Sequence, residues 1–245
     1  KCCEHHPEGV MNWLPDKTYD IVWVDLSPSQ RRVYEQMRKN MVAWVGEHEE
    51  SPLVASVVVA QLARLSQMTL ATPEFDEDGK IKLSLPSSKL DALKEILNDN
   101  PEKPFVVFTA SRQMAYIVSD ELERIGIRTD VLSGATRGDD RLTMVDRFQR
   151  GEFRVFVGVI QAAAEGIDGL QHVTDTAIFL DRSWSTLKNM QAEDRLHRGG
   201  QKDTVQIIDI MAKGTLDLGR KQRLETKWAW IKEILILKPP WKRQK

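Results

Sequence analysis

Six short apolar segments alternate with stretches of helical periodicity, and this alternation constrains the fold of the chain more than any other feature. Several of the segments are β-branched and apolar throughout, as strands buried on both faces of a parallel sheet are. The pattern predicts an α/β fold, with a mainly parallel sheet of about six or seven strands sandwiched by helices. The predicted strands are Ile21–Leu26, Phe105–Thr109, Thr129–Leu132, Val155–Val159, Thr176–Leu180 and Val205–Ile210.

Helical spacing fills the intervals between these strands. Apolar residues within 115–125 recur at helical intervals, and Gly126 stands where a left-handed residue would end that helix. Thr136 and Asp139 have the spacing of a capping box, which predicts a helix that begins there. Residues 216–237 predict a long final helix.

The pattern changes between residues 28 and 86. Ser29–Glu47 and Pro52–Met68 predict two helices, and the polar, turn-rich stretch Thr72–Gly79 follows them. An insertion of this length is too long for a loop of a compact sheet domain. Residues 28–86 therefore stand out as a mainly helical unit near the N-terminus of one predicted domain, residues 1–245.

Residues 191–201 carry the most informative polar pattern. On a helix, Gln191, Arg195 and Arg198 would share one stripe, because they are spaced i, i+4 and i+7, and the two glycines that follow would end that helix. Each guanidinium offers a planar fork of donors that matches phosphate oxygens. The spacing alone leaves two readings open: a polyphosphate site, or an ordinary surface ion pair between Asp194 and Arg198.

The same segment resembles motif VI of the Swi/Snf-type helicase-like ATPases, a branch of the superfamily-two helicases. Other landmarks of that family follow one another in the expected order, and together they span nearly the whole chain. They are Leu14–Lys17, Leu26–Gln30, Ser88–Leu93, Phe105–Ser111 (motif IV), Leu132–Thr136, Ala163–Asp168 (motif V) and Phe179–Trp184. The chain thus resembles the second, C-terminal RecA-like lobe of this family. The family resemblance implies that the mainly helical unit, residues 28–86, is a helical protrusion.

The resemblance implies a part in ATP hydrolysis. Arg195 and Arg198 would be arginine fingers, and Gln191 would orient phosphate or water. Gly166 and Asp168 would contact ATP, with Asp168 accepting from a ribose hydroxyl; a plain turn residue is the alternative for Asp168. The sequence has no Gly-x-x-x-x-Gly-Lys-Ser/Thr loop, so ATP and its Mg²⁺ would be held mainly by an absent first lobe.

The resemblance also implies contacts to the backbone of DNA, most naturally a duplex. Hydroxyls, backbone amides and helix N-termini bind phosphates without reading bases. Gln161 stands where the family commonly has Thr or Arg, and for Arg141 a partner on its own helix is an equal alternative. The implied DNA-binding residues are Thr109, Ser111, Arg112, Ser133, Gly134, Thr136, Arg141 and Gln161.

Composition narrows the class of protein. The formal net charge is −1, so any DNA contact must use local patches rather than an overall positive field. Residues 238–245 form one such patch, a basic tail, unless they are simply a solvated chain end. No apolar run reaches the roughly 18 residues that a membrane span needs, so no membrane partner is expected.

The cysteines and histidines near the N-terminus give no metal site. Cys2 and Cys3 are adjacent, and with His5 and His6 they lack the spacing of a zinc finger. Two adjacent cysteines also provide no disulfide framework, which fits a reducing, intracellular location. We expect the cytoplasm of a bacterium or of an infected cell rather than a nucleus.

Two functions of different class remain. The favoured one is the second motor lobe of a DNA-dependent ATPase and translocase, inactive alone, with DNA and the N-terminal RecA-like lobe of the same protein as partners. The alternative is a non-catalytic nucleic-acid-binding or interaction module with a degenerate helicase-lobe fold. A complete set of Gln191, Arg195 and Arg198 favours the first, because a pure binder does not need arginine fingers. A Rossmann-type enzyme is excluded, since no Gly-x-Gly-x-x-Gly follows the first strand.

Overall fold

The computed structural model describes residues 14–40, 42–45, 51–54, 58–78, 80–164 and 166–237. Cys2, Cys3, His5 and His6 lie outside the described residues, and so does the basic tail 238–245.

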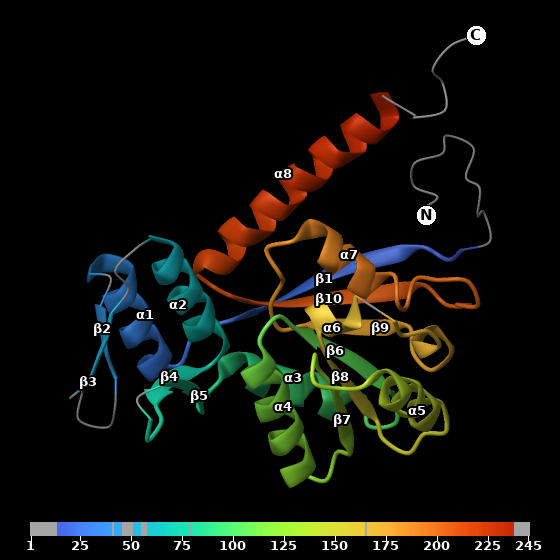
Figure 1. The fold of residues 1–245 in the computed structure, drawn as a ribbon, viewed down its shortest axis with the longest axis horizontal. Coiled ribbons are helices and arrows are strands. Elements are labelled where there is room, and N and C mark those ends of the chain that lie inside the picture. Colours follow the sequence, from blue (N-terminus) through green and yellow to red (C-terminus); the bar gives the residue numbers. More distant parts are fainter. Residues whose placement is uncertain are drawn as a thin grey trace.

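A six-stranded sheet forms the centre of the molecule (Figure 1), in the order β1-β10-β9-β6-β8-β7 with every neighbouring pair parallel. The predicted α/β fold and all six predicted strands are confirmed, although β1 begins four residues earlier than expected. The strands are β1 Lys17–Val24, β6 Phe105–Thr109, β7 Thr129–Leu132, β8 Val155–Val159, β9 Thr176–Phe179 and β10 Val205–Ala212.

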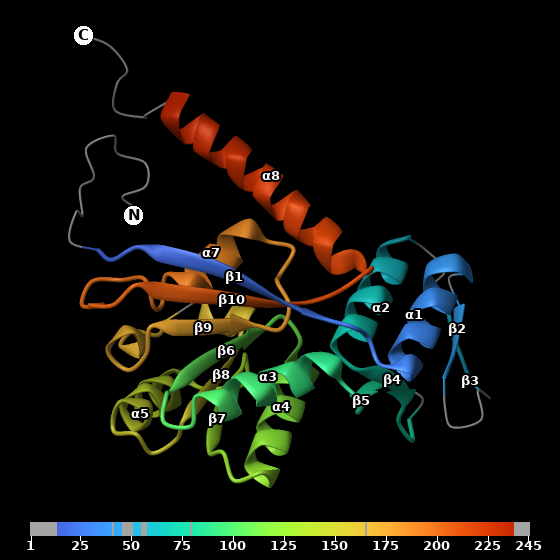
Figure 2. The same ribbon diagram turned by 180° about the vertical axis from the view of Figure 1, so that it is seen from behind.

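Helices cover both faces of this sheet. One face carries α3 (Ser88–Asp99) and α4 (Arg112–Arg124), and the other carries α5 (Gly138–Gln149), α6 (Ile160–Ala163) and α7 (Thr186–Glu193) (Figures 1 and 2). The handedness of the crossovers explains which helices share a face. The connections that contain α3 and α4 cross the sheet in one direction, and those that contain α5, α6 and α7 cross it in the other. Because each crossover between parallel strands is right-handed, opposite directions place the helices on opposite faces. Strands β6, β8 and β9 are consequently buried along their whole length.

The region 28–86 lies beside one end of the sheet (Figure 1) and is less helical than predicted. Two hairpins interrupt it, β2–β3 between the helices and β4–β5 after them. The helix expected at 29–47 therefore ends at Asn40, and the helix expected at 52–68 begins at Val58. The Val-Ala-Trp-Val sequence of β2 favours a strand, and the carboxylate of Asp76 closes the β4–β5 turn by accepting from two backbone amides. The elements are α1 Pro28–Asn40, β2 Val42–Val45, β3 Ser51–Val54, α2 Val58–Leu70, β4 Thr72–Phe75 and β5 Ile81–Ser84.

Three predicted helix boundaries have clear outcomes. Gly126 ends α4 with a φ of 84°, in the left-handed region, as expected. The capping box is wrong: α5 begins at Gly138, and the hydroxyl of Thr136 instead accepts from the amide of Ser133 in the preceding turn. The long final helix is confirmed as α8, Leu216–Leu237, whose second half extends away from the sheet (Figure 2).

Candidate nucleotide and nucleic-acid sites

The segment after α7 is not the continuous helix that its spacing predicts. Helix α7 ends at Glu193, and the amides of Arg195 and Leu196 turn back to the carbonyls of Ala192 and Glu193, at 3.2 and 3.0 Å. These are the shorter i→i−3 bonds of a tightened turn. The tightening places Leu196 in the core, where it is fully buried. The prediction that Gln191, Arg195 and Arg198 share one helical stripe is therefore wrong.

Arg195 binds the backbone of the loop between α6 and β9. Its guanidinium donates to the carbonyl oxygens of Ala163, Ala164 and Ile167, at 2.9, 2.5 and 2.7 Å. Two of these carbonyls end a short helix and would otherwise lack partners. Burial, and then the nearby charge of Arg198, lower the pKa of Arg195. Arg195 thus holds the loop that carries Gly166 and Asp168.

Arg198 lies beside Asp168, with 3.2 Å between Nη1 and Oδ1. The two side chains are 46% and 63% exposed, so both remain accessible to a ligand. Gln171 fixes the carboxylate by donating to Oδ1 at 3.0 Å, and its own carbonyl oxygen accepts from the amide of Gly169 at 2.9 Å. The sequence had placed Arg198 and Asp168 in one site but had offered Asp194, not Asp168, as the ion-pair partner of Arg198.

Two glycines shape this loop through their backbone conformation. Gly166 has a φ of 70° and Gly169 a φ of 107°, both in the left-handed region. A Cβ atom on Gly169 would lie only 2.4 Å from Nε2 of Gln149, which itself donates to the Gly169 carbonyl at 3.0 Å. Among the described hydrogen bonds, none joins Gln191 to this loop; Gln191 is partly exposed on the last turn of α7.

The exposed DNA candidates lie at the carboxyl ends of three neighbouring strands. Arg112 follows β6, Gly134 follows β7 and Gln161 follows β8, and all three are exposed. Ser111 is the N-cap of α4, where its hydroxyl accepts from the amide of Met114 at 3.3 Å. These loops form one edge of the sheet, which suits binding of a phosphate backbone.

Other candidates for DNA contact are turned into the protein. Thr109 and Ser133 are buried, so neither side chain is exposed at the sheet edge where DNA contact was expected. Thr109 donates to Asp181 at 2.7 Å, and the hydroxyl of Ser133 accepts from the amide of Ala135 at 3.3 Å. Arg141 donates to the carbonyls of Thr136 and Ala162, both of which lie outside its own helix. Each of these polar groups closes a loop from within.

A buried ionic network lies under α7. Arg182 pairs with Glu193 at 2.5 Å and with Asp209 at 2.6 Å, and Glu193 also receives Lys17 at 3.3 Å and Tyr19 at 3.0 Å. Burial alone would raise the pKa of Glu193, but the charges of Arg182 and Lys17 and the hydrogen bonds lower it overall. The network fastens α7, and hence the segment that carries Arg195, to strands β1 and β10.

A cavity of about 470 Å³ lies next to this network, between the sheet, α7 and α8. Arg195, Arg198 and Asp168 do not line it, so the cavity is separate from the candidate nucleotide site. Its polar walls include Lys17, Tyr19, Arg182, Glu193, Asp209 and Lys221.

Within the residues that the structure describes, no group of three or more His, Cys, Asp or Glu side chains could hold a metal ion. The helices in that same part of the chain lack the combination of length and apolar character needed to cross a bilayer.

Comparison with known proteins places this geometry in a family. Residues 88–200 match the helicase conserved C-terminal domain. The C-terminal part of the Fun30 ATPase domain superposes with a TM-score of 0.69 at 19% identity, covering 91% of this chain and 97% of that one. The Sulfolobus solfataricus SWI2/SNF2 ATPase core in complex with dsDNA superposes with a TM-score of 0.65 at 22% identity, covering 96% of this chain and 49% of that one. These structures show the RecA-like fold.

Curated relatives agree with these structures. Nuclear protein STH1/NPS1 of Saccharomyces cerevisiae is 25% identical over 220 residues, covering 83% of this chain and 16% of that protein. The putative ATP-dependent helicase/translocase YwqA of Bacillus subtilis is 26% identical over 232 residues, covering 91% of this chain and 24% of that protein. Over most of its length, the chain is similar to the C-terminal lobe of Swi/Snf-type helicases. It spans a quarter or less of the length of these two relatives.

Several residues that organise this helicase lobe were missed by the sequence reasoning. Asp181 and Arg182 carry no recognisable pattern by themselves, because their partners lie on other strands and helices. Gln171 was missed although its partners Asp168 and Gly169 are close to it in the sequence. A signal did exist for Asp181, which stands in the Phe179–Trp184 segment that resembles a family landmark. Its contact with Thr109 depends on β6 and β9 being neighbours in the sheet, which the sequence does not show.

Proposed function

We propose that this lobe completes an ATP site with a first RecA-like lobe, and that the two lobes together form a DNA-dependent ATPase and translocase. The observation that carries the proposal is the exposed ion pair of Arg198 and Asp168. Asp168 lies on a loop whose backbone carbonyls bind the guanidinium of Arg195. A guanidinium and a carboxylate offered side by side suit the phosphate and ribose ends of a nucleotide.

In this proposal Arg198 is the finger that reaches the transferred phosphoryl group. A guanidinium at that position stabilises charge on the phosphoryl oxygens and contributes about 10³–10⁵ in rate. Phosphate would compete with Asp168 for Arg198, and the released carboxylate would then accept from a ribose hydroxyl. Arg195 positions the loop and keeps donors available toward the nucleotide, and Gln191 orients phosphate or water. ATP brings its Mg²⁺, and the first lobe holds both.

The DNA surface in this proposal comprises Ser111, Arg112, Gly134, Thr136 and Gln161, at the ends of three neighbouring strands. A Sulfolobus solfataricus relative was solved with dsDNA, and we extend duplex binding to this chain. Hydroxyl, amide and guanidinium donors read the phosphate backbone, so binding would not depend on sequence. We keep a bacterial or infected-cell cytoplasm as the proposed location; the relatives include both a yeast nuclear protein and a bacterial one.

The test compares ATP hydrolysis by this chain alone with hydrolysis after fusion to its first lobe. We expect background activity alone and DNA-stimulated turnover in the fusion, where Arg198→Ala should lower kcat by roughly 10²-fold or more. Arg150→Ala is the matched control, because Arg150 also forms an exposed ion pair, with Asp146 on α5. Robust turnover by the chain alone would refute the two-lobe site, and a fusion that binds DNA without hydrolysing ATP would support the non-catalytic module.

A further inference from the structure

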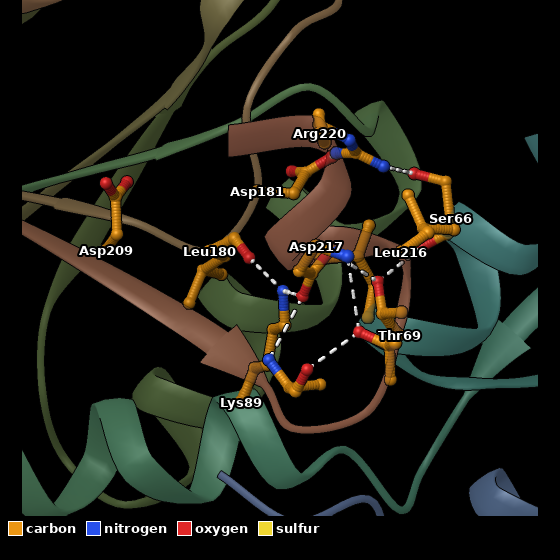
Figure 3. Close-up of polar contacts among 12 residues, drawn as sticks. Ser66, Thr69, Lys89, Leu180, Asp181, Asp209, Leu216, Asp217 and Arg220 are labelled. Carbon is orange, nitrogen blue, oxygen red and sulfur yellow. Dashed lines mark hydrogen bonds and ion pairs between the residues drawn. The ribbon is translucent and has the colours of Figure 1, made fainter. Parts of the chain in front are cut away.

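The first two turns of α8 carry two buried ionic links (Figure 3). Asp217 pairs with Lys89 of α3 at 2.6 Å, and Arg220, one turn later, lies 3.5 Å from Asp181 in the loop after β9. All four side chains are at most 5% exposed. Neither link contacts Arg198 or Asp168, so neither is explained by the nucleotide site.

Asp181 fixes the loop that leads into α4. Its Oδ1 accepts from the hydroxyl of Thr109 at 2.7 Å and from the amide of Ala110 at 2.8 Å. The Thr109 hydroxyl in turn accepts from the amide of Ser111 at 3.1 Å. One carboxylate therefore sets the backbone path from the end of β6 to exposed Arg112.

Arg220 connects that carboxylate to two other parts of the lobe. One Nη atom donates to the carbonyl of Arg182 at 2.9 Å, and the other donates to the hydroxyl of Ser66 on α2 (Figure 3). The guanidinium also lies 4.9 Å from the centre of the Trp184 ring. The side chain of Arg220 thus contacts both the 28–86 protrusion and the loop after β9.

The energetics favour a positioning role over simple stabilisation. A buried ion pair costs desolvation that a well-packed apolar pair avoids, so such a link contributes little net stability. Arg220 has a further cost, because its Nε is buried without an acceptor among the described residues. The link instead fixes positions, because a planar guanidinium that binds Asp181, the Arg182 carbonyl and Ser66 determines where each of these three groups lies.

We infer that Asp181 and Arg220 are positioning residues for the DNA-contacting loop 110–112, and that they fasten this loop to α8 and to the protrusion. The inference rests on the proposed function, because the contact of this loop with DNA is itself proposed. In the absence of the link, the loop keeps its sequence and exposed cation but loses its fixed path. DNA affinity then falls although no DNA-contacting residue has changed.

The experiment uses the 245-residue chain with Arg220→Met, Arg220→Lys and Thr109→Val. Thr109→Val loosens the same loop by removing one hydroxyl and leaves the buried charges paired. Arg223→Met is the matched control, because Arg223 lies on the same helix but is exposed. Amide hydrogen exchange at residues 110–112 and the dissociation constant of a short DNA duplex of arbitrary sequence are measured at low salt.

Arg220→Met and Thr109→Val should each speed exchange at 110–112 by roughly tenfold, with β8 still protected. The same variants should weaken duplex binding by roughly fivefold, because small displacements of a positioned group are costly. Arg220→Lys should recover part of both effects, and Arg223→Met should leave exchange unchanged.

Two results would decide against the inference. Parental exchange at 110–112 in a folded Arg220→Met chain would overturn it, and so would faster exchange with unchanged duplex affinity. If Arg220→Met does not fold, Thr109→Val decides by the same two measurements. A parent chain that does not bind the duplex would refute the proposed DNA surface instead, and exchange would still show whether Arg220 holds the loop.

Discussion

Replacing the two motif arginines one at a time should separate stability from catalysis. Arg195 makes three charge-assisted hydrogen bonds to the carbonyls of Ala163, Ala164 and Ile167, whereas Arg198 makes an exposed pair with Asp168. Hydrogen bonds to a charged group contribute about 1.5–3 kcal/mol each. Because Arg195 is only partly buried, water would reach the freed carbonyls, and we expect Arg195→Ala to cost about 2–4 kcal/mol in total.

Arg198→Ala should cost about 0–1 kcal/mol, the usual contribution of an exposed ion pair. For a chain of this size, about 2–4 °C of melting temperature accompanies each kcal/mol, so Arg195→Ala should melt about 5–15 °C below the parent. Arg195→Lys should fall between the two, because an ammonium cannot reach three carbonyls at once.

The assay is thermal and urea unfolding of the 245-residue chain, followed by kcat of the fusion with the first lobe. Both alanine variants should lose turnover, but only Arg195→Ala should also unfold more easily. Equal melting temperatures for the two variants would refute the structural role of Arg195. An unchanged kcat in Arg198→Ala would return Arg198 to an ordinary surface ion pair.

Three other predictions follow from the described contacts. Because the pKa of Glu193 is held below its ordinary value of 4.5, its stabilising contribution is present above that pH and is lost as pH falls through the lower folded-state value. Glu193→Gln should therefore be less stable than the parent at pH 7, and below about pH 4.5 its free energy of unfolding should fall less steeply with pH than that of the parent. Urea unfolding measures both effects, with the exposed Glu225→Gln as control. Gly169→Ala should destabilise the chain by roughly 2 kcal/mol or more, because a φ of 107° and a 2.4 Å approach to Gln149 both oppose a Cβ atom; parental stability in an unfolding titration would contradict this. Duplex binding should be independent of sequence and should weaken as salt rises, with a smaller salt slope in Arg112→Gln; a marked preference between two unrelated duplexes would count against a backbone interface.

The strands could be predicted from the sequence because burial on both faces demands apolar, β-branched runs, and β6 and β8 satisfy that demand residue by residue. The secondary structure of the protrusion was harder to predict. Val42–Val45 and most of Ser51–Val54 fall within the two predicted helices, and only the pairing of the two segments distinguishes the hairpin. Local periodicity cannot report a partner that lies elsewhere in the chain.

Polar residues were the main source of error at the site, because a hydroxyl at the end of a strand serves equally well as a ligand contact or as an internal tie. Thr109 and Ser133 resemble exposed phosphate contacts in the sequence, yet both are buried and bonded within the fold. Which outcome holds depends on whether a neighbouring strand presents a partner. Asp181 does so for Thr109, since β9 lies next to β6 in the sheet although about seventy residues separate the two strands.

The same reasoning explains why the two arginines of one motif differ. A strict helix would have presented Arg195 and Arg198 on one stripe, whereas in the structure only Arg195 binds the carbonyls of the α6–β9 loop. The tightened turn at Leu196 buries an apolar side chain and directs Arg195 inward, so the loop that carries Asp168 is held before any nucleotide arrives. Arg198, in the segment after α7, remains exposed beside that loop and pairs with the carboxylate of Asp168. In the proposed function, a phosphate group would need to displace only one exposed ion pair, worth about 1 kcal/mol or less, to reach Arg198.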